Sequence, residues 1–204
     1  GNFAVDDHGD LRIIGNQSPR YRYGVNLSAR WNGIGLSVFL QGVGARDWYP
    51  GSDAGMFWGK YGRPFFALIP SIHNYTDDMY SAERNNWDTA YWPRMTTYQS
   101  NGTKNWTRLL EIPNTRYIQS AAYLRVKNIQ LDYSFPKHIC SAIRLQGLKI
   151  YVNAENLFTF TPLHKYAPNF DPEGLSYDSD FASAADGYTY PILKSVTVGV
   201  NITF

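Results

Sequence analysis

The chain has 204 residues, of which 18% are charged and 16% are aromatic, and its formal net charge at pH 7 is +2. The basic residues are scattered instead of clustered, so the composition gives no support for a nucleic-acid partner. Cys140 is the only cysteine, which excludes an intrachain disulfide and a metal cluster built on thiolates. No segment approaches the roughly 20 consecutive apolar residues of a membrane-spanning helix.

The first residues contain an acidic cluster formed by Asp6, Asp7 and Asp10, beside His8 and Gly9. Closely spaced carboxylates are ligands that Ca²⁺ prefers, so a calcium site is one interpretation. The cluster lacks the alternating acidic ligands and the closing Glu of an EF-hand loop. A solvated acidic turn without metal is the alternative, and the spacing favours it.

Residues 21–31 and 34–44 alternate between two kinds of side chain, which predicts two β-strands. Asn32 and Gly33 stand between them. This pair is the strongest short signal for a hairpin, because a type I′ turn needs positive φ at both central residues. Each arm has about the 9–11 residues that a tilted strand needs to cross a bilayer. Strands of soluble sandwiches usually have about five or six residues, so the length favours a membrane protein.

Residues 45–121 show no comparable pair of strands and are rich in Gly, Pro and aromatic residues. We expect a long ordered loop in which most of the aromatic side chains pack against one another. A few exposed rings are candidates for stacking on a sugar or a peptide side chain. These substrate-binding candidates are Trp48, Trp58, Trp87 and Trp92.

Two further strands are predicted at residues 122–135 and 147–157, joined by a short turn that begins at Pro136. A second irregular segment, 158–191, follows them. On the first of these strands, Arg125 and Lys127 have the same parity as the apolar Ile129. That parity predicts two cations above the lipid headgroups, where they would meet the phosphates of lipopolysaccharide.

Residues 192–204 form the last predicted strand. Its apolar face carries Val196, Val198, Val200, Ile202 and Phe204, and the residues between them are polar or Gly. The strand also resembles the C-terminal signal by which outer-membrane barrels of Gram-negative bacteria are recognised for insertion. The residues that carry this barrel-assembly signal are Thr197, Gly199, Ile202 and Phe204.

The strand directions support one another. If Phe204 lies at the periplasmic end, the alternating strand directions place the Asn32-Gly33 turn and the turn at residues 136–145 at the periplasmic side, and segments 45–121 and 158–191 lie outside. Short periplasmic turns and long external loops are the rule in outer-membrane barrels. The sequence therefore predicts an all-β fold, with antiparallel strands forming the C-terminal part of a large transmembrane β-barrel with long extracellular loops.

Several groups of residues also resemble one transporter family. They are residues 7–15, Tyr21-x-Tyr-Gly-x-Asn26, Ser37-Val-Phe-x-Gln-Gly42, Trp92-Pro-Arg94, 123–136, 150–161, 190–191 and 198–204. Together they resemble the C-terminal region of the SusC/RagA-type TonB-dependent outer-membrane transporters, over nearly the whole chain. Asp132 departs from the family pattern, which usually has a small residue there, and Lys194 stands where Arg is common.

The resemblance implies a large barrel in the outer membrane of a Gram-negative bacterium, occluded by an N-terminal plug. It implies import of glycans or oligopeptides, driven by the TonB complex, with a SusD-like surface lipoprotein acting as a lid. The 204 residues contain no recognisable plug, and five strands are fewer than the roughly eight of the smallest natural barrels. We therefore expect residues 1–204 to be a C-terminal segment, whose partners are the remaining barrel, the plug, the TonB complex through an N-terminal part, and outer-membrane lipid.

Two other interpretations remain open on these residues. One is a soluble β-sandwich carbohydrate-binding module whose aromatic loops form the site. The other is a glycosidase that uses Asp171 and Glu173. Retaining chemistry needs two carboxyl groups about 5–5.5 Å apart, which two neighbouring loop acids do not ensure. No nucleophile elbow, metal triad or phosphate loop is present, so we expect no enzyme activity, and no cofactor apart from the Ca²⁺ considered at the acidic cluster.

Overall fold

The computed structural model describes residues 12–49, 80–91, 113–167, 170–175 and 192–204. Its elements are β1 (Arg20–Trp31), β2 (Ile34–Ala45), β3 (Asp47–Trp48), β4 (Gln119–Ser120), β5 (Tyr123–Ser134), α3 (Lys137–Ala142), β6 (Gly147–Phe160), the 3₁₀ helix η3 (Pro162–Lys165) and β7 (Ser195–Thr203). No helix in these residues is long and apolar enough to cross a membrane.

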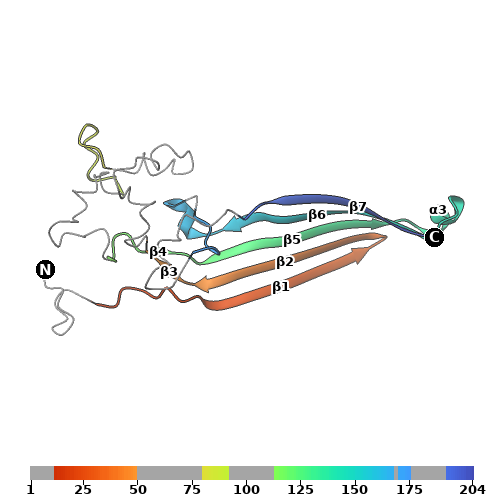
Figure 1. Ribbon diagram of the computed structural model, residues 1–204, viewed down its shortest axis with the longest axis horizontal. Helices are drawn as coiled ribbons and strands as arrows, with labels where there is room; N and C mark the ends of the chain where they lie inside the picture. The colour runs from red at the N-terminus through yellow and green to blue at the C-terminus, as the bar shows by residue number, and fades with distance from the viewer. Residues whose placement is uncertain (1–11, 50–79, 92–112, 168–169, 176–191) are drawn as a thin grey trace. The chain divides into compact units, whose positions relative to one another are not determined.

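Five long strands form one antiparallel sheet in the order β1-β2-β5-β6-β7 (Figure 1). This arrangement confirms the all-β prediction, and within the described residues the sheet is not closed. The predicted strand 147–157 extends to Phe160, and the predicted strand 192–204 is shortened to Ser195–Thr203. The short pair β3–β4, which the alternation did not predict, forms a second sheet inside segment 45–121.

Local sequence explains both connections at the turn end of the sheet. Asn32 and Gly33 have φ values of 45° and 86°, so this turn has the two positive φ angles that a type I′ hairpin requires. Pro136 precedes the one-and-a-half turns of α3, where its fixed φ of −62° starts the helix and ends β5.

The long sheet has two chemically different faces, because directly paired residues of antiparallel strands lie on the same side. One row across all five strands is polar: Ser28, Ser37, Gln130, Asn153 and Thr197. The neighbouring row on the other face is apolar: Leu27, Val38, Ile129, Ala154 and Val196. The period-two pattern of each strand is therefore in register with that of its neighbours.

Two bulges interrupt this register. Lys127 is the extra residue on β5, because Phe39 pairs with Asn128 while the next residue of β2 pairs with Val126. On β6 the shift falls between Glu155 and Phe158, beside Asn156, whose φ is 53°. A bulge moves every following side chain of its strand to the opposite face.

The chain divides into two compact units. One contains the long sheet with α3. The other contains β3, β4 and parts of segments 45–121 and 163–189, and it has its own small core. The buried members of that core are Trp48, Tyr49, Tyr117, Ala121, Leu163, Ala167, Phe170 and Leu175.

Candidate functional site

The apolar face of the long sheet is uncovered within the described residues. Val198, Val200 and Ile202 have exposed fractions between 49% and 72%, although all three pair with apolar residues of β6. An apolar surface that runs across five strands is far larger than the patches that soluble monomers usually expose. The face therefore needs an apolar environment that the described residues do not supply.

Aromatic side chains border this apolar face at both ends. The turn end carries exposed Trp31, Tyr133 in the same row across the sheet, and exposed Phe204. Exposed Tyr23 and Phe160 stand at the other end. Eight residue steps separate Tyr23 from Trp31, which is roughly 26 Å along the strand and about 20 Å in height at a tilt of ~40°. Aromatic girdles around an apolar band of about 25 Å are typical of transmembrane barrels, so the dimensions agree.

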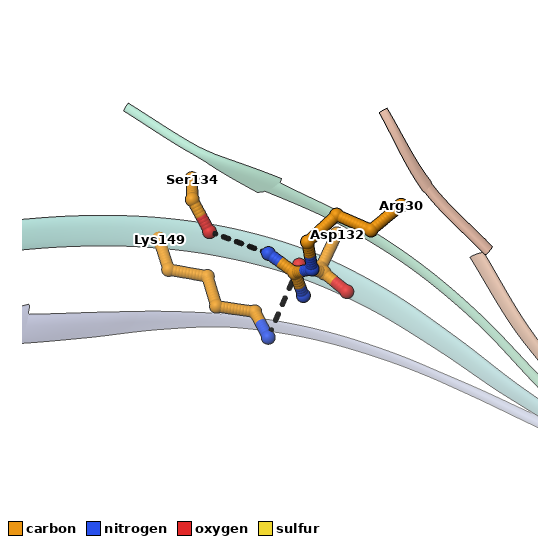
Figure 2. A network of polar contacts seen from close by, with 4 residues as sticks. All are labelled: Arg30, Asp132, Ser134 and Lys149. Carbon is orange, nitrogen blue, oxygen red and sulfur yellow. Dashed lines mark hydrogen bonds and ion pairs between the residues drawn. The ribbon is translucent and has the colours of Figure 1, made fainter. Parts of the chain in front are cut away.

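The polar face carries an ion-pair network close to the turn end (Figure 2). Arg30 Nη2 and Lys149 Nζ lie 3.0 Å and 3.1 Å from the same Asp132 Oδ1, and Arg30 Nη1 donates to Ser134 Oγ at 3.3 Å. The side chain of Asp132 is only 3% exposed. The carboxylate noted from the sequence is thus neutralised by two cations, one from β1 and one from β6, and the group carries a net positive charge.

Gly35 explains how this network fits on the sheet. It pairs with both Arg30 and Asp132, and a Cβ at Gly35 would collide with the carboxylate and the guanidinium. The alternation along each strand places every residue of the network on the polar face, but it is the strand order β1-β2-β5-β6 that brings them together. Sequence reasoning missed the network because β1 and β5 are separated by about ninety residues and by β2.

Four residues were predicted to form the barrel-assembly signal, and the structure divides them between the two faces. Thr197 and Gly199 lie on the polar face, paired with Asn153 and Tyr151. Ile202 and Phe204 have the apolar parity and are exposed. The ring of Tyr151 lies over Gly199 and leaves no room there for a Cβ. Their role in assembly stays a prediction.

The predicted position of Arg125 is wrong. Because the bulge at Lys127 reverses the parity, Arg125 pairs with Gln41 and Thr159 on the polar face. Its side chain is buried and its Nε donates to Thr159 Oγ1 at 2.9 Å. Arg125 is therefore not available for lipopolysaccharide phosphates above the apolar face.

The four predicted substrate-binding tryptophans fall in different places. Trp48 is 2% exposed and packs against Phe170, with ring centroids 5.0 Å apart, so it is part of a core and does not offer an exposed ring. Trp87 is 71% exposed. Trp58 and Trp92 lie outside the described residues, as do the acidic residues considered for Ca²⁺, which are Asp6, Asp7 and Asp10. The described residues contain no group of three or more potential metal ligands.

Arg46 organises the segments around the small core. Its guanidinium donates to three backbone carbonyls, those of Gln17, Pro172 and Leu175, at 3.1, 3.1 and 2.6 Å. In the same loop, the Asp171 carboxylate accepts a hydrogen bond from the backbone N–H of Glu173 at 2.9 Å. Asp171 thus stabilises an Asx turn, which is a structural role.

A group of tyrosines extends this core. The rings of Tyr91 and Tyr166 stack with centroids 3.6 Å apart, and Tyr117 meets Tyr91 edge-on at 5.9 Å. Lys165 Nζ lies 4.8 Å from the centre of the Tyr166 ring. Burial, followed by the neighbouring tyrosines, raises the pKa of Tyr91 to about 12, and burial also raises the pKa of Tyr49. These phenols therefore stay neutral at physiological pH.

No family model matches the chain. Three curated relatives from Formosa agariphila, named TonB-dependent receptors P3, P39 and P26, are 25%, 24% and 22% identical to it. The matches cover 96%, 100% and 96% of this chain, but only 17%, 18% and 18% of the relatives. The chain thus spans less than a fifth of the length of the receptors that it matches.

Solved structures show the same fold. The RagAB peptide importer in its 'closed-closed' state has a TM-score of 0.56 at 20% identity, and in its 'open-open' state 0.53 at 18% identity. A further RagAB peptide transporter structure gives 0.56 at 19% identity. Each match covers 95% of this chain and 18% of the other chain.

Receptors and importers of this kind are transporters and not enzymes, as the sequence led us to expect. The resemblance inferred from the sequence is confirmed: the chain is related over nearly its whole length to TonB-dependent receptors, and its strands are arranged as in the barrel of the SusC/RagA-type transporters.

Proposed function

We propose that this chain is part of a TonB-dependent importer in the outer membrane of a Gram-negative bacterium. The observation that carries the proposal is the exposed apolar face of a sheet whose other face is mostly polar, with the row Ser28, Ser37, Gln130, Asn153 and Thr197 crossing all five strands. Lipid covers the apolar face and a water-filled bore lies against the polar face. The similarity to TonB-dependent receptors supports this role.

The cargo is an oligopeptide or a glycan. The RagAB structures are of a peptide importer, which supports the first class. Exposed aromatic rings suit both classes, since they stack on sugars and on peptide side chains, and Trp87 is the candidate among the described tryptophans. The further partners in this proposal are the rest of the barrel with its plug, the TonB complex and a SusD-like surface lipoprotein.

A β-sandwich module is not favoured by the geometry. A sandwich buries one face of each sheet against a second sheet. Among the described residues the long strands form a single layer, and the short β3–β4 pair belongs to the other compact unit.

The proposal is tested in the source bacterium by deleting the gene that contains this chain and supplying oligopeptides or oligosaccharides as the only nutrient. We expect loss of growth on one class, recovery by the intact gene, and the same loss when TonB is depleted. The protein should separate with the outer-membrane fraction. Recovery of the protein in the soluble fraction, or growth that depends on neither the gene nor TonB, would refute the proposal.

A further inference from the structure

The connection between β5 and β6 exposes apolar side chains on a short helix. Ile139 lies on α3 and Ile143 is the C-cap residue that follows it, and their exposed fractions are 39% and 52%. Cys140 lies on the inner side, 1% exposed, with Sγ 3.7 Å from the carbonyl oxygen of Phe135. The connection therefore packs Cys140 against the strand end and leaves two isoleucines exposed, one on α3 and one at its C-cap.

The same connection is cationic. Lys137, His138 and Arg144 are exposed, and the sequence contains no Asp or Glu from residue 133 to residue 154. The nearest carboxylate in sequence, Asp132, is already shared by Arg30 and Lys149. Within the described residues, neither Lys137 nor Arg144 forms an ion pair. Their charges are thus available to an external anion.

The position of the connection is fixed by the sheet. The backbone N–H of Phe135 donates to Leu148 O at 2.9 Å, and that of Gln146 donates to Thr203 O at 2.9 Å. Figure 1 shows α3 beyond the ends of β5 and β6. The aromatic residues Trp31 and Phe204 border the apolar face at this same end. Aromatic girdles mark the membrane–water interface, so α3 stands directly outside that boundary.

We infer that Lys137, Arg144, Ile139 and Ile143 bind an anionic phospholipid of the membrane leaflet at the turn end of the sheet. The isoleucines reach the acyl boundary and the two cations meet the headgroup phosphate, as in interfacial amphipathic segments. This inference rests on the proposed function, because it requires the apolar face to lie in a bilayer. It adds a lipid-binding site, formed by these four residues, to the barrel wall.

The test uses the complete transporter in detergent, titrated with phosphatidylglycerol or phosphatidylcholine, with bound lipids counted by native mass spectrometry. Lys137→Gln combined with Arg144→Asn should weaken phosphatidylglycerol binding roughly tenfold or more. Asn is chosen because Arg144 has a φ of 60°, which Asn tolerates. Ile139→Ser with Ile143→Ser should also weaken binding, and excess inorganic phosphate should not displace the lipid.

The matched control removes two exposed cations at the opposite end of the sheet, by Arg20→Gln with Lys194→Gln, and should leave phosphatidylglycerol binding unchanged. Equal binding of the two lipids, an equal loss in the control, or displacement by phosphate would overturn the inference. If one of these outcomes is found while the transporter still separates with the outer membrane and imports its cargo, the lipid site is refuted and the proposed function is not. If the wild-type protein is absent from the outer membrane, the proposed function fails as well.

Discussion

The carboxylate of Asp132 is covered on the sheet by the side chains of two cations, Arg30 and Lys149, which are themselves partly exposed. Arg30 and Lys149 both lie within ion-pair distance of the same oxygen of Asp132, so the carboxylate is neutralised on the polar face of the sheet. Gly35 supplies the space, and Ser134 takes one of the remaining Arg30 N–H groups. One polar cluster therefore links β1, β5 and β6 across Gly35 of β2.

We predict that Asp132→Asn destabilises the folded transporter, since Arg30 and Lys149 lose the carboxylate that they share. The temperature at which the barrel loses its fast-migrating folded form in gel electrophoresis should fall. Ser134→Ala is the matched control, because it removes only the 3.3 Å bond to Arg30 and should cost less than half as much. Equal effects of the two variants would show that the ion pairs contribute little.

Gly199 illustrates a second constraint at the scale of one residue. We predict that Gly199→Ala lowers the amount of assembled transporter, because the new Cβ would collide with the ring of Tyr151. Gly147→Ala on the neighbouring strand is the control, since a Cβ there meets Thr203 only at 3.6 Å. Both variants would be compared by their folded fraction in outer membranes.

The double variant Gly199→Ala with Tyr151→Ala separates packing from recognition of the C-terminal signal. Recovery of assembly in the double variant would assign the defect to the steric collision with Tyr151. A defect that persists without the Tyr151 ring would instead mean that Gly199 itself is recognised during insertion into the membrane.

At the scale of the strand, the bulge at Lys127 decides which face receives Arg125. We predict that deleting Lys127 moves Arg125 to the apolar face and costs its bond to Thr159, a loss of roughly 1–3 kcal/mol in folded stability. The folded fraction in the outer membrane should fall. Combining the deletion with Arg125→Leu should restore part of it, because Leu is compatible with lipid. An unaffected deletion variant would contradict the assigned register.

The bulge also shows what could be predicted from the sequence. Alternation that continued for nine or more residues located β1, β2, β5, β6 and β7, because a strand with two different faces must repeat with period two. The same rule failed at Arg125, since a single inserted residue reverses parity without any local signal. Asn156 has a positive φ and lies at the register shift of β6, but its presence in the sequence does not reveal the shift until the strand pairing is known.

The candidate site was less predictable than the fold. Composition identified segment 45–121 as rich in aromatic residues. Which of their side chains are buried depends on contacts between residues far apart in the sequence, such as the packing of Trp48 against Phe170. The Arg30–Asp132–Lys149 cluster likewise depends on strand order. Its members could be assigned to the polar face from parity alone, but not to one another.

At the scale of the whole molecule, the sheet has two outer strands, β1 and β7, each of which pairs with one neighbour within the described residues. An unpaired strand edge in hydrocarbon leaves backbone groups without partners at several kcal/mol each. The relatives are more than five times longer than the matched region, which is consistent with further strands that complete the wall. The five strands are thus expected to be stable in a bilayer only as part of that larger barrel.

The last prediction concerns the environment of the two faces. Nitroxide labels would be placed singly at residues 196, 197, 198, 200 and 201 of β7 in the complete transporter, with Cys140 replaced by Ser. In lipid, labels at 196, 198 and 200 should collide with dissolved oxygen, while labels at 197 and 201 should collide with a water-soluble nickel complex. The alternation follows from the opposite faces of Val198 and Thr197. Labels at 196, 198 and 200 that are shielded from both reagents would indicate a packed interior, and the membrane assignment would then be wrong.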